Sequence, residues 1–192
     1  MLITWKLCSG LPSIRRRAEA DVFFSALRRV NREHRIRIVH WVILSNHIHA
    51  IVEGEDGEAI GQAMKGLTVS LSRRWNRLWN RSGQVFADRY HRTDLDRPTK
   101  VRNALTYVFA NNAKHTGGRP CIHRAQSSGR TKLAPYVDAR YSSALYFTAW
   151  QEPYIERLPP DDRSPRPRSW LLRTGFLRSG GAISASAKPA LA

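Results

Sequence analysis

The sequence of 192 residues contains only two cysteines, Cys8 and Cys121, which stand far apart. This scarcity argues against a disulfide framework or a four-ligand zinc site, and it agrees with a cytoplasmic location, where thiols stay reduced. No apolar run approaches the roughly 20 residues that a membrane-spanning helix needs. The first residues, interrupted by Lys6, indicate a strand and make a poor signal peptide. Secreted disulfide scaffolds and membrane proteins are therefore unfavoured, and no membrane partner is expected.

Acidic residues are also scarce, because 15 Asp and Glu face 32 Lys and Arg and leave a net charge of +17. Most of the cations are arginines, whose planar fork suits phosphate groups and stacked bases. A hydrophobic content of 42% is that of a globular protein with an ordinary core. The charge therefore predicts a folded protein that binds nucleic acid.

Hydrophobic periodicity predicts a series of strands and helices in the first 117 residues. The strands are expected over residues 2–7, 35–44, 47–53 and 84–92, and the helices over 14–32, 58–81 and 98–115. The first six of these elements follow the order βαββαβ, which predicts an α+β fold with a ferredoxin-like antiparallel sheet and one appended helix. Residues 118–192 are expected to form a basic, Pro- and Arg-rich C-terminal extension that is partly disordered, including the last dozen residues.

The helix expected over residues 58–81 combines an apolar stripe with a basic flank. The apolar side chains recur at spacings of three and four, at Ile60, Met64, Leu67, Leu71, Trp75 and Leu78. The basic flank consists of Arg73, Arg74, Arg77 and Arg81. We expect these arginines, together with Lys114 of the later helix, to contact DNA.

Two histidines, His47 and His49, stand two residues apart on a predicted strand, so their side chains share one face. Ile48 and Ala50 are expected on the other face, and Ile51 on the histidine face. Two neighbouring imidazoles can hold one divalent ion, because neutral imidazole is a common metal ligand. Taken alone, the same pattern also fits ordinary strand histidines.

Tyr107 and Asn111 stand four residues apart on the appended helix and therefore share a face. A tyrosine can act as a covalent nucleophile toward a phosphodiester, and an asparagine can add an oxygen ligand to a metal held by two histidines. The alternative is a partly buried tyrosine beside a solvated asparagine.

Three motifs together resemble one protein family. The first is HWVILSNHIHAIVE, residues 40–53, which resembles the His-hydrophobic-His metal motif of single-tyrosine HUH transposases. The second, GQVFADRYH, is similar to the segment that follows the long helix in REP-associated tyrosine transposases. The third, ALTYVFANNAKH, resembles the helix that carries the nucleophile of that family, although Asn112 replaces a common proline. A weaker resemblance joins SWLLRTGF, near the C-terminus, to a tail motif of the family.

The resemblance implies metal-dependent cleavage and rejoining of hairpin-forming single-stranded DNA through a 5′-phosphotyrosine. It implies that Tyr107 is the nucleophile and that His47, His49 and Asn111 hold Mg²⁺ or Mn²⁺. The sequence leaves a monomer and a homodimer equally open. Such a metal would bind a phosphate oxygen and neutralise developing charge.

A non-catalytic nucleic-acid binder is the alternative from another class. An RNA-recognition module has the same element order, but its third strand should carry stacking aromatics, and residues 46–53 contain none. An inactive, domesticated relative of the transposases stays open, because intact motifs do not prove turnover.

Overall fold

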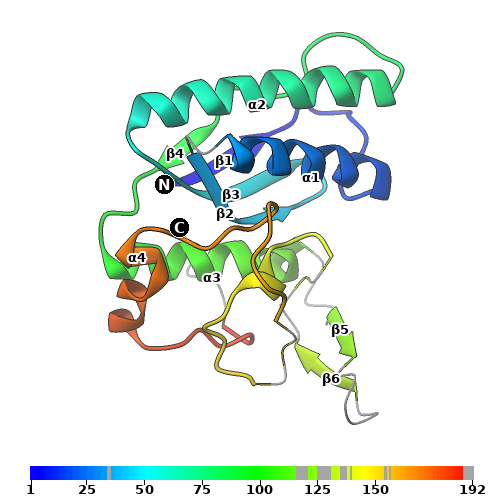
Figure 1. Cartoon of the computed structure of the whole chain (residues 1–192). Coiled ribbons are helices and arrows are strands. Elements are labelled where there is room, and N and C mark those ends of the chain that lie inside the picture. Colours follow the sequence, from blue (N-terminus) through cyan, green and yellow to red (C-terminus); the bar gives the residue numbers. More distant parts are fainter. Residues whose placement is uncertain are drawn as a thin grey trace.

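Four strands form an antiparallel sheet, and helices cover both of its faces (Figure 1). The structure is a computed structural model. It describes residues 1–33, 36–115, 121–124, 131–134, 138, 140–153, 155 and 157–187, and for residues 112–115, 121–124 and 131–134 it describes the backbone only. None of the helices within these ranges is long and apolar enough to cross a membrane.

The strands are β1 (Leu2–Lys6), β2 (Ile36–Ile43), β3 (His47–Gly54) and β4 (His91–Thr93), in the spatial order β2-β3-β1-β4. All neighbouring strands are antiparallel. This is the sheet expected from the element order of the sequence, so the predicted α+β fold is confirmed.

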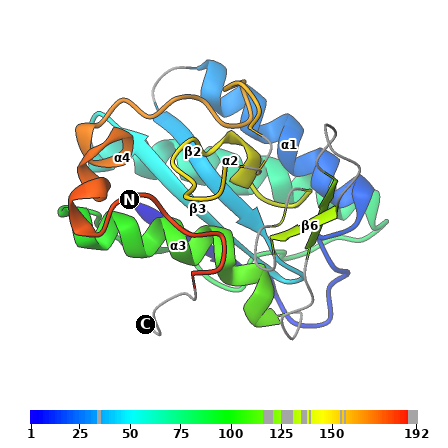
Figure 2. The same cartoon turned by 90° about the horizontal axis from the view of Figure 1, so that it is seen from below.

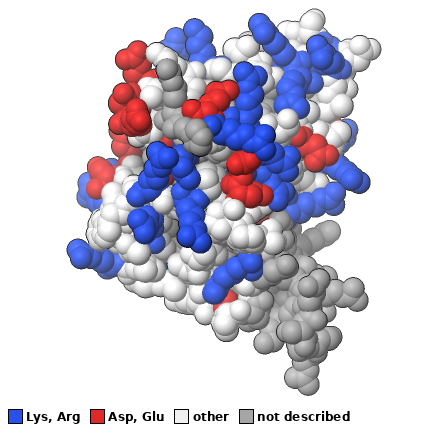
Figure 3. Space-filling model, in the orientation of Figure 1, with Lys and Arg blue, Asp and Glu red and all other residues white. Residues whose placement is uncertain are grey.

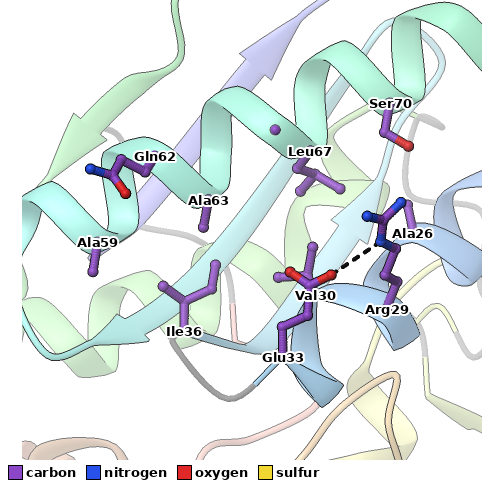
Figure 4. Close-up of a pocket in the computed structure, with 11 residues that line it drawn as sticks. Ala26, Arg29, Val30, Glu33, Ile36, Ala59, Gln62, Ala63, Leu67 and Ser70 are labelled. Carbon is purple, nitrogen blue, oxygen red and sulfur yellow. Dashed lines mark hydrogen bonds and ion pairs between the residues drawn. The ribbon is translucent and has the colours of Figure 1, made fainter.

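Helices α1 (Arg17–Arg32) and α2 (Gly57–Leu78) pack together on one face of the sheet. A shallow hollow of about 260 Å³ separates part of the two helices, and the Arg29–Glu33 ion pair lies at its rim (Figure 4). The apolar stripe of α2 faces the sheet, apart from Leu78, which is exposed. The buried members of this core include Ile3, Trp5, Phe23, Trp41, Ile48, Ala50, Met64, Leu71 and Trp75.

Helix α3 (Pro98–His115) covers the other face, and the C-terminal segment lies beside it (Figure 2). This segment contains the short helices η1 (Ala144–Tyr146), α4 (Trp170–Arg173) and η2 (Gly175–Ser179). They share a second core with α3 and the sheet, which includes Val39, Val42, Ile51, Val101, Leu105, Val108, Phe109, Phe147, Trp150, Leu172 and Phe176. A separate two-stranded sheet joins β5 (Cys121–Arg124) to β6 (Thr131–Ala134).

Three of the expected boundaries are wrong. Helix α1 begins at Arg17 instead of residue 14, because residues 14–16 form a turn in which the Ser13 hydroxyl accepts from Arg15 N–H at 3.3 Å. Helix α2 ends at Leu78 rather than residue 81. In place of a strand over residues 84–92, Phe86 forms one bridge with Leu7, and the regular strand β4 is confined to His91–Thr93.

The described part of the C-terminal extension packs against the rest of the protein. Within the last dozen residues, Ile183 and Ala185 are buried, and Ile183 pairs with Trp150. The Pro-rich stretch lacks regular structure, as expected, yet the Ser164 hydroxyl donates to the Val39 carbonyl at 2.5 Å. The polar, Pro-rich composition of these residues suggests disorder. Composition alone does not reveal the apolar surface of α3 that their few apolar side chains cover. The division of the chain at residue 117 stays a prediction.

Candidate functional site

The two histidines of β3 and the tyrosine of α3 meet on one face of the sheet. The ring centroids of His47 and His49 are 4.8 Å apart, and those of His49 and Tyr107 are also 4.8 Å apart. The Tyr107 hydroxyl lies 3.3 Å from His49 Nε2. As expected, Ile48 and Ala50 are buried in the opposite core, while Ile51 belongs to the core beneath α3.

His49 is held at both ring nitrogens. Only 3% of the residue is exposed, and its Nδ1 lies 2.8 Å from the Thr4 hydroxyl oxygen. Thr4 and His49 are direct neighbours in the register of β1 and β3. A neutral imidazole has one N–H, so when the phenol donates to Nε2, Nδ1 donates to Thr4. The arrangement leaves the lone pair of Nε2 directed at Tyr107.

Thr4 is a site residue that the sequence patterns do not indicate. Its pairing with His49 depends on the register between two strands that are more than 40 residues apart in the chain. His47, which is only half-buried, has its Nδ1 2.8 Å from the Asn46 side-chain oxygen.

Asn111 is fully buried, so the alternative of a solvated asparagine is wrong. It follows Tyr107 by one turn of α3, and neither its amide nitrogen nor its amide oxygen has a hydrogen-bond partner in the described part of the chain. Leaving a buried amide unpaired costs on the order of 1–3 kcal/mol. Such a group is suited to bind a partner that the protein itself does not provide.

The donor set constrains the kind of metal site that could form. The described residues contain no group of three or more His, Cys, Asp or Glu side chains that could hold a metal ion. A metal centre here would therefore use the two imidazoles with Oδ1, the side-chain amide oxygen of Asn111. The orphaned amide fits that role, and the set leaves coordination positions for water or phosphate oxygens.

The arginines expected to contact DNA are not close to this site. They belong to α2 and the turn that follows it, and α2 lies on the opposite face of the sheet from α3 (Figure 1). Lys114 falls within α3, but its side chain is outside the described residues. Elsewhere, Lys and Arg side chains spread over much of the face shown in Figure 3.

Two of these four arginines are partly engaged within the protein, and the other two are exposed. The Arg74 guanidinium donates to the Val22 carbonyl at 3.3 Å. Arg81 donates to the Asn76 side chain at 2.8 Å and to the Gln84 carbonyl at 3.3 Å, which ties down the turn after α2. Arg73 and Arg77 are exposed and border a hollow of about 370 Å³ that Arg29 also lines.

Comparison with known proteins gives one structural likeness. No family model and no curated protein matches the chain. Among solved structures, a REP-associated tyrosine transposase bound to a REP hairpin is similar over 60% of this chain and 67% of that chain, with 17% sequence identity and a TM-score of 0.43. The function must therefore be inferred from the site itself.

Proposed function

We propose that this protein cleaves and rejoins single-stranded DNA through a covalent bond between Tyr107 and a 5′ phosphate. The observation that carries the proposal is the 3.3 Å contact between the Tyr107 hydroxyl and His49 Nε2. It brings a potential nucleophile from α3 against a pair of imidazoles on β3. The net charge of +17 supports a polyphosphate substrate.

The reaction follows from these positions. A phenol becomes a good nucleophile when it loses its proton. Water takes up this proton, because His49 Nδ1 is engaged by Thr4 and Nε2 is the one ring nitrogen left to hold a cation. The phenolate oxygen attacks phosphorus, forms the Tyr107–O–P bond and breaks the bond from phosphorus to the 3′ oxygen. The departing 3′ oxygen takes up a proton and becomes a free hydroxyl. Its attack on the phosphotyrosine reverses the step, so rejoining needs no ATP.

A divalent cation fits beside these groups. His47, His49 and the Asn111 carbonyl oxygen would hold Mg²⁺ or Mn²⁺, and the orphaned Asn111 amide supports this assignment. When bound, the ion would polarise the scissile phosphate and neutralise its developing charge. The Thr4 contact at Nδ1 orients His49 so that Nε2 faces the reacting side.

The test is a denaturing gel of the protein with labelled, hairpin-forming single-stranded DNA in the presence of Mn²⁺. The wild-type protein should give an adduct that resists denaturation, and Tyr107→Phe, which removes only the hydroxyl, should give none. His47→Ala should abolish the adduct while DNA binding persists. An adduct that survives in Tyr107→Phe would contradict the assignment of the nucleophile.

A DNA-binding role without catalysis is the second candidate. It is favoured by the position of Arg73 and Arg77, which lie on the opposite face of the sheet from Tyr107 and could bind DNA without the site. Salt-dependent DNA binding with no adduct on any hairpin tested would support this function instead.

A further inference from the structure

A second basic pocket lies at the edge of the sheet, away from α2. It has a volume of about 650 Å³ and lies between β2, one of the two edge strands, and the C-terminal segment. Arg37 and His40 of β2 form one side. Residues 164–168 together with residues of α4 and η2 form the other.

Four arginines line this pocket, and no acidic side chain does. They are Arg37, Arg166, Arg168 and Arg173. Within the described residues, none of the four guanidinium groups forms a hydrogen bond or an ion pair. The Nε of Arg37 is buried and has no partner there. Because an unpaired buried N–H of a cation is costly, the pocket is built for an anion.

The arginine-bearing strap, residues 164–168, is fixed in place by the sheet. The Glu53 carboxylate accepts from Arg168 N–H at 2.7 Å and from Ser169 N–H at 2.8 Å. At the other end of the strap, Ser164 donates to the Val39 carbonyl. The two prolines of the strap restrict the backbone between these anchors. Its arginines are therefore presented on a backbone that is already ordered, which lowers the entropic cost of binding.

We infer that this pocket binds the phosphate backbone of a single-stranded DNA segment. The inference rests on the proposed function, since it adds a second contact to the same DNA. Arginine forks pair with phosphate oxygens. The aromatic rings at the floor are nearly covered, because Tyr146 is 9% and Phe147 is 4% exposed. Little ring surface is left for a base, so the phosphates are the groups recognised.

The pocket and the candidate catalytic centre lie on opposite flanks of α3. His40, which lines the pocket, packs against Phe109 with ring centroids 5.2 Å apart. Tyr107 precedes Phe109 by two residues, which places it about 200° around the helix. A strand held in the pocket therefore lies across α3 from the centre, where it can anchor DNA without entering the reaction.

The test measures the binding of a labelled 20-nucleotide single strand across a salt series, with Tyr107→Phe as the background so that cleavage plays no part. Arg166→Gln with Arg168→Gln should weaken binding. It should also lower the slope of log affinity against log salt by about 0.7 for each phosphate that the variant no longer neutralises. Arg157→Gln with Arg178→Gln is the matched control, because it removes the same charge from exposed positions outside the pocket. Thermal melting checks the fold, and Arg173→Gln alone serves if the double variant is unstable.

Equal affinity and slope in the pocket variant and its control would overturn the inference. A parallel titration with inorganic pyrophosphate separates a strand from a small anion. Suppose that pyrophosphate binds to the wild-type protein but not to the pocket variant, while the two proteins bind DNA with the same affinity. The pocket then serves a small polyphosphate, and the inference is wrong. Neither result depends on adduct formation, so failure of the proposed catalysis is seen separately.

Discussion

The Thr4 hydroxyl lies 2.8 Å from Nδ1 of His49, and the two residues face each other across β1 and β3. This contact fixes the imidazole of a residue that is almost completely buried. It also determines which nitrogen can face Tyr107, because the other one is engaged by the threonine. Thr4 is thus a positioning residue for the proposed reaction.

Replacing Thr4 by valine keeps the shape of the side chain and removes the hydrogen bond to Nδ1. We expect adduct formation to slow by roughly 10- to 100-fold, the usual effect of losing a hydrogen bond behind a metal-binding histidine. DNA affinity should not change. Thr4→Ser restores a hydroxyl and should recover most of the rate. If Thr4→Val forms the adduct at the wild-type rate, the imidazole is positioned by other contacts.

The fold and the pairing of the main site residues could be predicted from the sequence for clear physical reasons. The alternation on β3 places His47 and His49 on one face, and the offset of Tyr107 from the apolar stripe of α3 leaves its side chain beside that face. Local periodicity is sufficient for the first statement, whereas the packing of α3 on the histidine face is expected from the family resemblance and is seen only in the tertiary structure. The roles of these residues in catalysis stay predictions, as do the metal and the DNA substrate.

Other features depend on tertiary contacts that local patterns do not contain. A bulge between Ile38 and His40 shifts the register of β2, so that Val39 and His40 both contact the α3 side. Arg74 looks like Arg73 in the sequence, but it is bound to the α1 backbone. The order of the C-terminal segment likewise comes from the core that it shares with α3.

The buried Asn111 provides a prediction that separates function from stability. Asn111→Leu replaces an unpaired amide with an apolar group of similar size, which removes a desolvation cost of about 1–3 kcal/mol. The free energy of unfolding should therefore stay the same or rise, whereas adduct formation should be abolished. Chemical denaturation and the adduct gel measure the two effects. A clear decrease in stability would mean that the amide has a structural partner.

The exposed arginines of α2 provide a prediction about the DNA path. Arg73→Gln with Arg77→Gln should lower the salt slope of single-strand binding by about 0.7 for each phosphate that these side chains neutralise in the wild-type complex. The effect should be additive with that of the pocket variant, because the two sites lie on different faces. Lys65→Gln with Arg89→Gln is a charge-matched comparison around the neighbouring groove beside α2. An unchanged slope for Arg73 and Arg77 would exclude this face from the DNA path.

His40 should make the protein less stable in mild acid. The residue is 4% exposed, and its ring packs between Phe109 and Phe147. Burial lowers the pKa of His40 to about 3 from the ordinary value of 6.5. Below pH 6.5 the unfolded chain therefore binds a proton that the folded chain does not.

Stability from this residue is fully present above pH 6.5 and falls as the pH drops toward 3, with a limiting slope of about 1.4 kcal/mol per pH unit. Other titrating groups also contribute, so the comparison is with His40→Leu, which keeps the site apolar. Urea unfolding of both proteins is measured at pH 7, 6, 5 and 4. Below pH 6.5, the free energy of unfolding of the wild-type protein should fall progressively relative to that of His40→Leu. Parallel curves would show that the folded protein accommodates the charged imidazole, in which case Ser143, whose hydroxyl lies 3.4 Å from His40 Nδ1, is the first partner to test.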